Sequence, residues 1–182
     1  KNNGIYIRSW ERILYRDFTE FSIGCSLLGY KPKSHAAIKD QLAVQSPLSS
    51  LLSPYEPALA IELNDFLGEK RVWKFCRGGG EALAITVRLA RSVALNTRVL
   101  VCGYHGTHDW YLASNLSSTN DLSKIFLDGI SPDGIPKAYS GTTVSLPALS
   151  AENLRRSIAK EDPGVIFFEA CRYKLLDVES IQ

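Results

Sequence analysis

The spacing of apolar residues changes several times along this 182-residue chain, and these changes divide it into predicted strands and helices. The runs at residues 99–103 and 165–169 are almost continuously apolar, which is typical of strands in a parallel sheet covered on both faces. Residues 72–76 are predicted as a third strand, and helical spacing predicts a helix over residues 81–94. Because strands alternate with helices, we predict an α/β domain with a mainly parallel sheet and helices on both faces.

A hairpin signal and two helix signals precede this alternation. Imperfect apolar alternation across residues 4–18 predicts a hairpin. Helical spacing predicts helices at residues 33–45 and 53–68. We expect residues 1–48 to form a separate N-terminal segment that packs on the first part of a large domain, residues 49–182.

Residues at helix ends indicate where the helices begin and end. Ser53 is predicted as an N-cap, with Pro54 in the first helical position and Glu56 completing a capping box. Gly68 marks the C-terminal end of that helix. Ser150 is predicted to cap a later helix that precedes the last strand.

Composition and charge narrow the class of protein. Hydrophobic residues make up 45% of the chain and charged residues 22%, and the net charge of +2 gives no basis for binding nucleic acid or an acidic membrane. No apolar run reaches the roughly 20 residues of a membrane-spanning helix, and the first residues lack the apolar stretch of a signal peptide. Four cysteines without a C-x-x-C pair favour free thiols over a metal site or disulfides. We therefore expect a cytoplasmic protein without nucleic-acid or membrane partners.

Three consecutive glycines, Gly78, Gly79 and Gly80, stand where the predicted strand at 72–76 runs into the helix at 81–94. A helix N-terminus has free N–H groups and a partial positive charge, and glycine lets a phosphate approach that backbone closely. A tight turn without a ligand is the alternative. The segment is neither a P-loop nor a dinucleotide-binding fingerprint, because it lacks the G-K-[ST] of the first and the last glycine of the second.

A second strand end, at residues 102–111, reads CGYHGTHDWY. His105 and His108, followed by Asp109, have some likeness to a metal site, but a third convincing ligand is missing and we predict no metal. Tyr104 follows the strand and a glycine, where its flat ring could stack on a ligand; ordinary packing is the alternative. Ligands of parallel sheets bind at the carboxyl ends of the strands, so the two strand ends together form the candidate site.

Three segments resemble, in their order and spacing, those of class III aminotransferases. These are fold-type I enzymes that depend on pyridoxal 5′-phosphate (PLP), and glutamate-1-semialdehyde 2,1-aminomutase is a close relative. FCRGGGEALAITVRLARS is similar to the strand, N-S-G-T-E-A motif and helix of the family. GYHGTHDWYLASNL is similar to its Y-H-G segment, in a form found among members associated with surface-polysaccharide genes, and LLGYKPKSHAAIKDQL is similar to its L-G-H-x-P segment. The chain thus resembles the N-terminal half of such an enzyme.

The resemblance implies a cofactor, PLP, and a role for several residues. The glycines at 78–80 correspond to the residues at the cofactor phosphate, and Tyr104 corresponds to the ring that stacks on the pyridine, with His105 beside it. Glu169 corresponds to the acidic residue that opens the family's E-P segment, which implies a place behind the residues that touch the cofactor.

The chain departs from the family pattern in three places. The glycines at 78–80 lack both side-chain hydroxyls of the family's phosphate loop, and Ala170 follows Glu169 where the family has proline. We expect the family's Schiff-base lysine and the aspartate that binds the pyridine nitrogen beyond Gln182, since Lys174 lies in the wrong element to replace that lysine. Catalytic residues are therefore not assigned in this chain, and we expect activity only together with further residues.

The resemblance implies that the protein transfers an amino group from a small-molecule amino donor to a carbonyl acceptor, or moves it within one molecule as an aminomutase. Small-molecule or surface-polysaccharide biosynthesis is the implied setting. A homodimer is implied because the family builds its active sites between subunits. Two other hypotheses stay open at this point: a non-catalytic module that binds a cofactor or a sugar phosphate, and a subunit that only completes a dimer.

Overall fold

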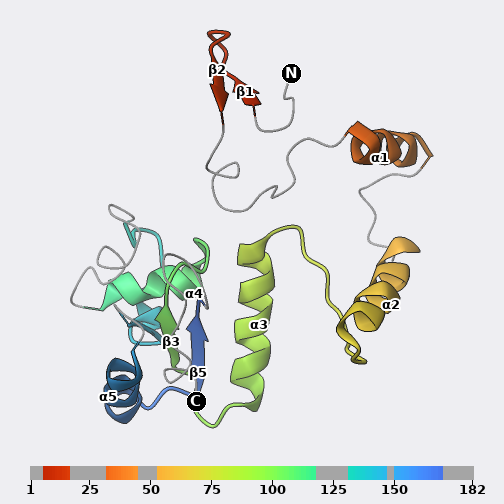
Figure 1. Cartoon of the computed structure of the whole chain (residues 1–182). Helices are drawn as coiled ribbons and strands as arrows, with labels where there is room; N and C mark the ends of the chain where they lie inside the picture. Colours follow the sequence, from red (N-terminus) through yellow and green to blue (C-terminus); the bar gives the residue numbers. More distant parts are fainter. Residues whose placement is uncertain (1–5, 17–31, 45–52, 118–130, 147–149, 170–182) are drawn as a thin grey trace. The chain divides into compact units, whose positions relative to one another are not determined.

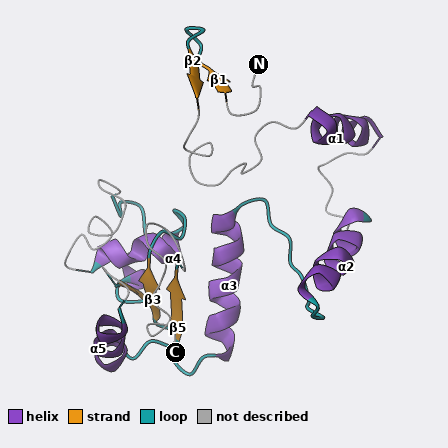
Figure 2. Cartoon of the chain, in the orientation of Figure 1, coloured by secondary structure: helices purple, strands orange, loops and turns teal. Residues whose placement is uncertain are grey.

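The chain divides into two compact units, residues 1–70 and 71–182. Figure 1 follows the chain along its sequence, and Figure 2 marks its helices and strands. The boundary that we expect between residues 48 and 49 stays a prediction. The computed structural model describes residues 6–16, 32–44, 53–117, 131–146 and 150–169.

The first unit contains the predicted hairpin. Strands β1 (Tyr6–Arg8) and β2 (Leu14–Arg16) pair antiparallel. The backbone N–H of Arg12 donates to the carbonyl of Ser9 at 3.0 Å and closes the turn between the strands. Alternation of apolar and polar residues therefore predicted this element correctly.

Both predicted helices of the first unit are confirmed as α1 (Pro32–Val44) and α2 (Tyr55–Leu67). The start of α2 differs in detail, because the Ser53 hydroxyl accepts a hydrogen bond from the first amide of the helix at 3.3 Å and the capping box with Glu56 is not formed. Gly68 ends the helix as predicted, with a φ of 66° in the left-handed region that glycine tolerates.

The second unit is built on a parallel sheet. Its three strands lie in the order β4 (Thr143–Ser145), β3 (Val99–Cys102) and β5 (Val165–Phe168). In this register Val101 lies opposite both Ser145 and Phe167. The sheet confirms the predicted α/β class. Strand β4 was not predicted, since three residues are too few to establish a period of two.

The predicted strand at residues 72–76 is wrong for the described structure, because residues 71–76 form neither helix nor strand. Val72 is fully exposed, and no strand in the described ranges pairs with this segment. A strand needs a neighbour to complete its backbone hydrogen bonds, so a suitable apolar spacing is not sufficient by itself.

Helix α3 (Gly79–Val93) covers one face of the sheet, together with the short helix α4 (Asp109–Leu112). The buried residues that pack there are Val87, Val99, Val101, Trp110, Tyr111 and Val165. Figure 1 shows α3 and α5 (Ala151–Glu161) flanking the strands, as expected for helices on both faces. Ile166 and Phe168 are 37% and 40% exposed, so the prediction that this strand is buried on both faces is wrong in the described structure.

Two hydrogen bonds and one close backbone approach hold α5 and the segment between α5 and β5. The Ser150 hydroxyl accepts a hydrogen bond from the helix backbone at 3.2 Å, which confirms the predicted cap of α5. Arg98 donates to the carbonyl of Glu161, the last residue of α5, at 2.7 Å. A Cβ at Gly164 would overlap the carbonyl oxygen of Asn96, so these two loops can approach only if residue 164 is glycine.

Three further findings concern the sequence predictions. Cys76 and Cys102 are half-buried and are not in a disulfide, whereas Cys25 and Cys171 lie outside the described residues. Within the described ranges, no helix combines the length and the apolar character needed to span a bilayer. No group of His, Cys, Asp or Glu side chains in the same ranges could hold a metal ion.

Candidate functional site

The two strand ends that the sequence marks as one site are in contact. A Cβ placed on Gly106 would lie 3.1 Å from the Cα of Gly80, and a Cβ placed on Gly80 would lie 2.7 Å from two ring atoms of His108. The turn after β3 therefore lies directly on the first turn of α3. Neither glycine could carry a side chain without moving its neighbour.

The glycine loop opens helix α3. Gly78 is the N-cap in an extended conformation, and α3 begins at Gly79, two residues before the predicted start. A Cβ on either of these glycines would meet nothing within 4 Å. The Glu81 carboxylate accepts a hydrogen bond from the backbone N–H of Arg77 at 3.0 Å and so links the two ends of the glycine loop. Two glycines thus border open space at a helix N-terminus, whereas the third is required by a close neighbour.

The turn that carries Tyr104 is held by two side chains. Gly103 has a φ of 97°, which strains any residue with a Cβ. The hydroxyl of Tyr111 donates to the carbonyl of Gly103 at 2.6 Å, and Oε2 of Glu169 accepts from the N–H of Tyr104 at 3.0 Å. The Tyr104 ring is half-buried and meets the Tyr111 ring edge-on, with centroids 6.3 Å apart. Tyr104 and Glu169 are therefore neighbours in the structure, while the cofactor roles that the resemblance implies for them stay predictions.

His105 is buried in the core and is not exposed at the site. Its ring is 5% exposed and lies within 6.1 Å, between centroids, of the rings of Tyr111 and Phe167. Nε2 is 3.0 Å from the carbonyl oxygen of Cys102. Burial lowers the pKa of the His105 imidazole, while the hydrogen bond to Cys102 and the charge of Glu169 oppose this shift. The cofactor contact predicted for His105 stays a prediction, and the burial favours a packing role.

His108 is the residue at this site that the sequence did not mark as a cofactor neighbour. It is exposed, and its ring lies against Gly80 in the first turn of α3. The sequence suggested His108 only as a metal ligand, together with His105 and Asp109. No local pattern indicates its contact with α3, because that contact depends on how two distant segments pack.

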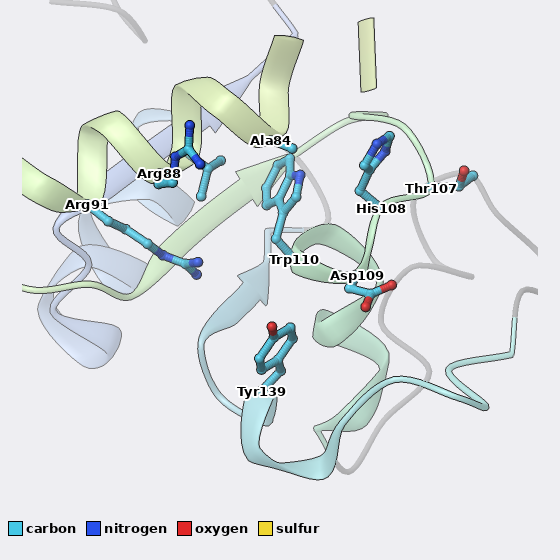
Figure 3. Close-up of a pocket in the computed structure, with 9 residues that line it drawn as sticks. Ala84, Arg88, Arg91, Thr107, His108, Asp109, Trp110 and Tyr139 are labelled. Atoms are coloured by element: carbon cyan, nitrogen blue, oxygen red, sulfur yellow. The ribbon is translucent and has the colours of Figure 1, made fainter. Parts of the chain in front are cut away.

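A cavity of about 660 Å³ lies along the flank of α3, and its lining does not include the glycine loop or Tyr104. Figure 3 shows residues of α3 on one side of it, with Trp110 and Tyr139 across from them. Arg91 donates to the carbonyls of Thr97 and Thr142 at 2.7 and 3.1 Å. Burial lowers the pKa of the Arg91 guanidinium, and the charge of Tyr139 opposes that shift. The lining residues are Ala84, Val87, Arg88, Arg91, Thr107, His108, Asp109, Trp110 and Tyr139.

Comparisons with known proteins show which proteins this chain is similar to and which fold it shares. No family model matches the chain. The 2′-deamino-2′-hydroxyneamine transaminase of Streptomyces kanamyceticus is 33% identical over 113 residues, which cover 62% of this chain and 29% of that protein. A glutamate-1-semialdehyde 2,1-aminomutase of Saccharolobus islandicus is 27% identical over 135 residues, which cover 71% of this chain and 31% of that protein. The solved structure of a transaminase with PLP bound matches 94% of this chain and 40% of its own, with a TM-score of 0.75 and 18% identity.

These comparisons confirm the resemblance to class III aminotransferases and the incomplete α/β fold of PLP-dependent transaminases. The chain spans 29% and 31% of the length of the two curated relatives. One of them is a transaminase and the other an aminomutase, so the resemblance covers both activities.

Proposed function

We propose that the chain is part of a PLP-dependent aminotransferase or aminomutase of the class III type. The observation that carries this proposal is the contact of Gly106 with Gly80, which joins the glycine loop and the tyrosine turn at one edge of a parallel sheet. Parallel sheets bind their ligands at this edge. The curated relatives and the PLP-bound transaminase support the same class.

The residues present fit a cofactor that carries a phosphate. Open space lies where side chains would stand on Gly78 and Gly79, so an anion can approach their backbone. The 15-residue helix α3 adds free N–H groups and a partial positive charge at the same place. We assign the phosphate to residues 78–80. The cofactor ring is assigned to Tyr104, where stacking on an aromatic face stabilises by about 0.5–1.5 kcal/mol.

The residues of this chain would bind and orient the cofactor. PLP, when bound, supplies an electron sink that lets an amino group leave one carbon and join another. The glycine loop would hold the phosphate, and Tyr104 would set the tilt of the ring. Glu169 and Tyr111 would keep the Tyr104 turn in place through the hydrogen bonds described above. We assign no residue of this chain to proton transfer.

The finer statements are also proposals. We propose a small-molecule amino donor and a carbonyl acceptor, in small-molecule or surface-polysaccharide biosynthesis. We further propose that the protein works as a homodimer in the cytoplasm. The resemblance supports the proposed substrates, setting and homodimer. The spacing of the four cysteines, which favours free thiols, supports the cytoplasm.

The proposed function is tested with PLP and the purified intact protein, which includes the further residues on which we expect activity to depend. Amino transfer from a panel of amino compounds to 2-oxoglutarate is followed as glutamate formed, and isomerisation of amino aldehydes is followed without an acceptor. We expect turnover in one of these assays that depends on PLP and is not supported by pyridoxal, which lacks the phosphate. Tight PLP binding without turnover in either assay would favour the non-catalytic module. No PLP binding would contradict the cofactor assignment.

A further inference from the structure

We infer that His108 is a phosphate-binding residue of this site and supplies the side-chain donor that a loop of three glycines lacks. This inference rests on the proposed function and deepens it. It begins from an observation that the sequence resemblance does not contain, namely the contact of the imidazole with Gly80.

The His108 ring packs against Gly80, and this contact defines the position of the ring. Its Cε1 and Nδ1 atoms each lie 2.7 Å from the point where a Cβ of Gly80 would stand. In a helix the Cα–Cβ bonds tilt toward the N-terminus. The imidazole therefore occupies the place of a side chain at residue 80, on the side of the helix N-terminus.

The backbone around His108 is anchored on both sides. Gly106 precedes it with a φ of 90° and contacts Gly80. The carbonyl of His108 accepts hydrogen bonds from the amides of Tyr111 and Leu112 at 2.9 and 3.1 Å, as the N-cap of α4. The ring is thus presented to the first turn of α3 by a fixed turn and a helix start.

The chemistry of the loop leaves a place for such a donor. Gly78, Gly79 and Gly80 offer backbone N–H groups but no side-chain hydroxyl or amide. The Glu81 carboxylate accepts from the N–H of Arg77. A neutral imidazole donates from one ring nitrogen and an imidazolium from two, and a hydrogen bond to an ionised phosphate is stronger than one between neutral groups. Because His108 is exposed, a ligand can reach its ring.

A packing role for His108 is the alternative, since the ring also lines the cavity beside α3. Two substitutions separate the alternatives. His108→Phe keeps a flat ring against Gly80 but has no donor. His108→Gln keeps a donor but has no ring.

The probe is 4′-deoxypyridoxine 5′-phosphate, which lacks the aldehyde and does not react with lysines. Its phosphate-free form, 4′-deoxypyridoxine, is the control, and both are titrated into the purified protein by calorimetry. We expect His108→Phe to weaken binding of the phosphate probe about tenfold or more, which corresponds to about 1.4 kcal/mol, without changing binding of the control. His108→Gln should remain closer to the wild type. Unchanged phosphate-probe binding in a folded His108→Phe variant would overturn the inference.

A reciprocal exchange tests the geometry. Gly80→Ser should weaken binding of the phosphate probe in the wild type, because its Cβ would collide with the His108 ring. In a His108→Ala background the same serine has room and offers a hydroxyl, so the double variant should bind the probe more tightly than His108→Ala alone. A double variant that is no better than His108→Ala would overturn the inference. If the wild type does not distinguish the two probes, the proposed phosphate site itself is wrong, and the role of His108 is rejected with it.

Discussion

Replacing Glu169 should loosen the turn that carries Tyr104 while leaving the strands paired. Oε2 of Glu169 accepts from the Tyr104 N–H at 3.0 Å, whereas the backbone N–H of Glu169 donates to the carbonyl of Cys102 at 3.1 Å. Only the first of these bonds involves the side chain. Glu169→Leu removes it, and Glu169→Gln keeps a neutral acceptor of similar shape.

The size of the effect follows from the character of this bond. A hydrogen bond to a charged group contributes about 1.5–3 kcal/mol, and one between neutral groups about 0.5–1.5 kcal/mol. Glu169 is half-buried, so water competes for the carboxylate and reduces the contribution to the low end of the charged range or slightly below it. We expect a loss of about 1–2 kcal/mol of local stability for Glu169→Leu and about half of that for Glu169→Gln.

Native-state hydrogen exchange of the Tyr104 amide measures this loss directly. Each 1.4 kcal/mol corresponds to about a tenfold change in protection, so Glu169→Leu should exchange about five- to thirtyfold faster at Tyr104. Amides of β3 that pair with β4 should be unaffected and serve as the internal control. Equal Tyr104 protection in the wild type and in Glu169→Leu would refute the reasoning.

Three further changes test other parts of the structure. Gly164→Ala would place a Cβ in overlap with the Asn96 carbonyl oxygen, so we expect urea unfolding to show a loss of more than about 3 kcal/mol of stability. Gly79→Ala is the matched control, because a Cβ there meets nothing within 4 Å, and it should keep or raise stability. Burial lowers the pKa of His105 below its ordinary 6.5, so protonation favours the unfolded chain. The stability that the neutral ring contributes is therefore present above pH 6.5 and is lost as the pH falls through the lowered pKa. In urea unfolding, the free energy of unfolding of His105→Gln should fall less on acidification than that of the wild type. Tyr104→Leu, made in the intact protein, keeps the apolar bulk but loses the flat ring. Turnover per bound cofactor should fall clearly, and cofactor affinity should fall by no more than about tenfold. Full turnover per bound cofactor would count against stacking.

Local signals account for the elements that the sequence predicts correctly. The apolar run of β3, the Ser150 cap of α5 and the glycine stop of α2 each depend on residues within one or two turns. The segment at 72–76 has a suitable spacing, yet no described strand pairs with it. Strand β4 escaped prediction because it is short and because its buried residue, Thr143, is polar; the Thr143 hydroxyl donates to the carbonyl of Trp110.

The candidate site also contains residues that local motifs predict and residues whose role depends on packing. Gly78 and Gly79 follow from one short motif and Tyr104 from another, each read from residues next to it in the sequence. The need for glycine at residue 80 has a different origin, because it comes from the ring of His108, which is distant in the sequence. His105, by contrast, looked like a site residue from its motif, but the packing of aromatic rings around it is a property of the folded core.

The central proposal, a phosphate at the N-terminus of α3, is tested most directly by Gly79→Asp. A Cβ at residue 79 would meet nothing within 4 Å, and a carboxylate in the first turn of a helix stabilises the helix by about 0.3–1 kcal/mol. The same carboxylate would occupy the proposed phosphate position and repel the anion, and Gly79→Asn is the uncharged control. We predict that Gly79→Asp keeps or raises the free energy of unfolding but abolishes the preference for 4′-deoxypyridoxine 5′-phosphate over 4′-deoxypyridoxine, with a smaller loss in Gly79→Asn. A folded Gly79→Asp variant that binds the phosphate probe as tightly as the wild type would contradict the proposal.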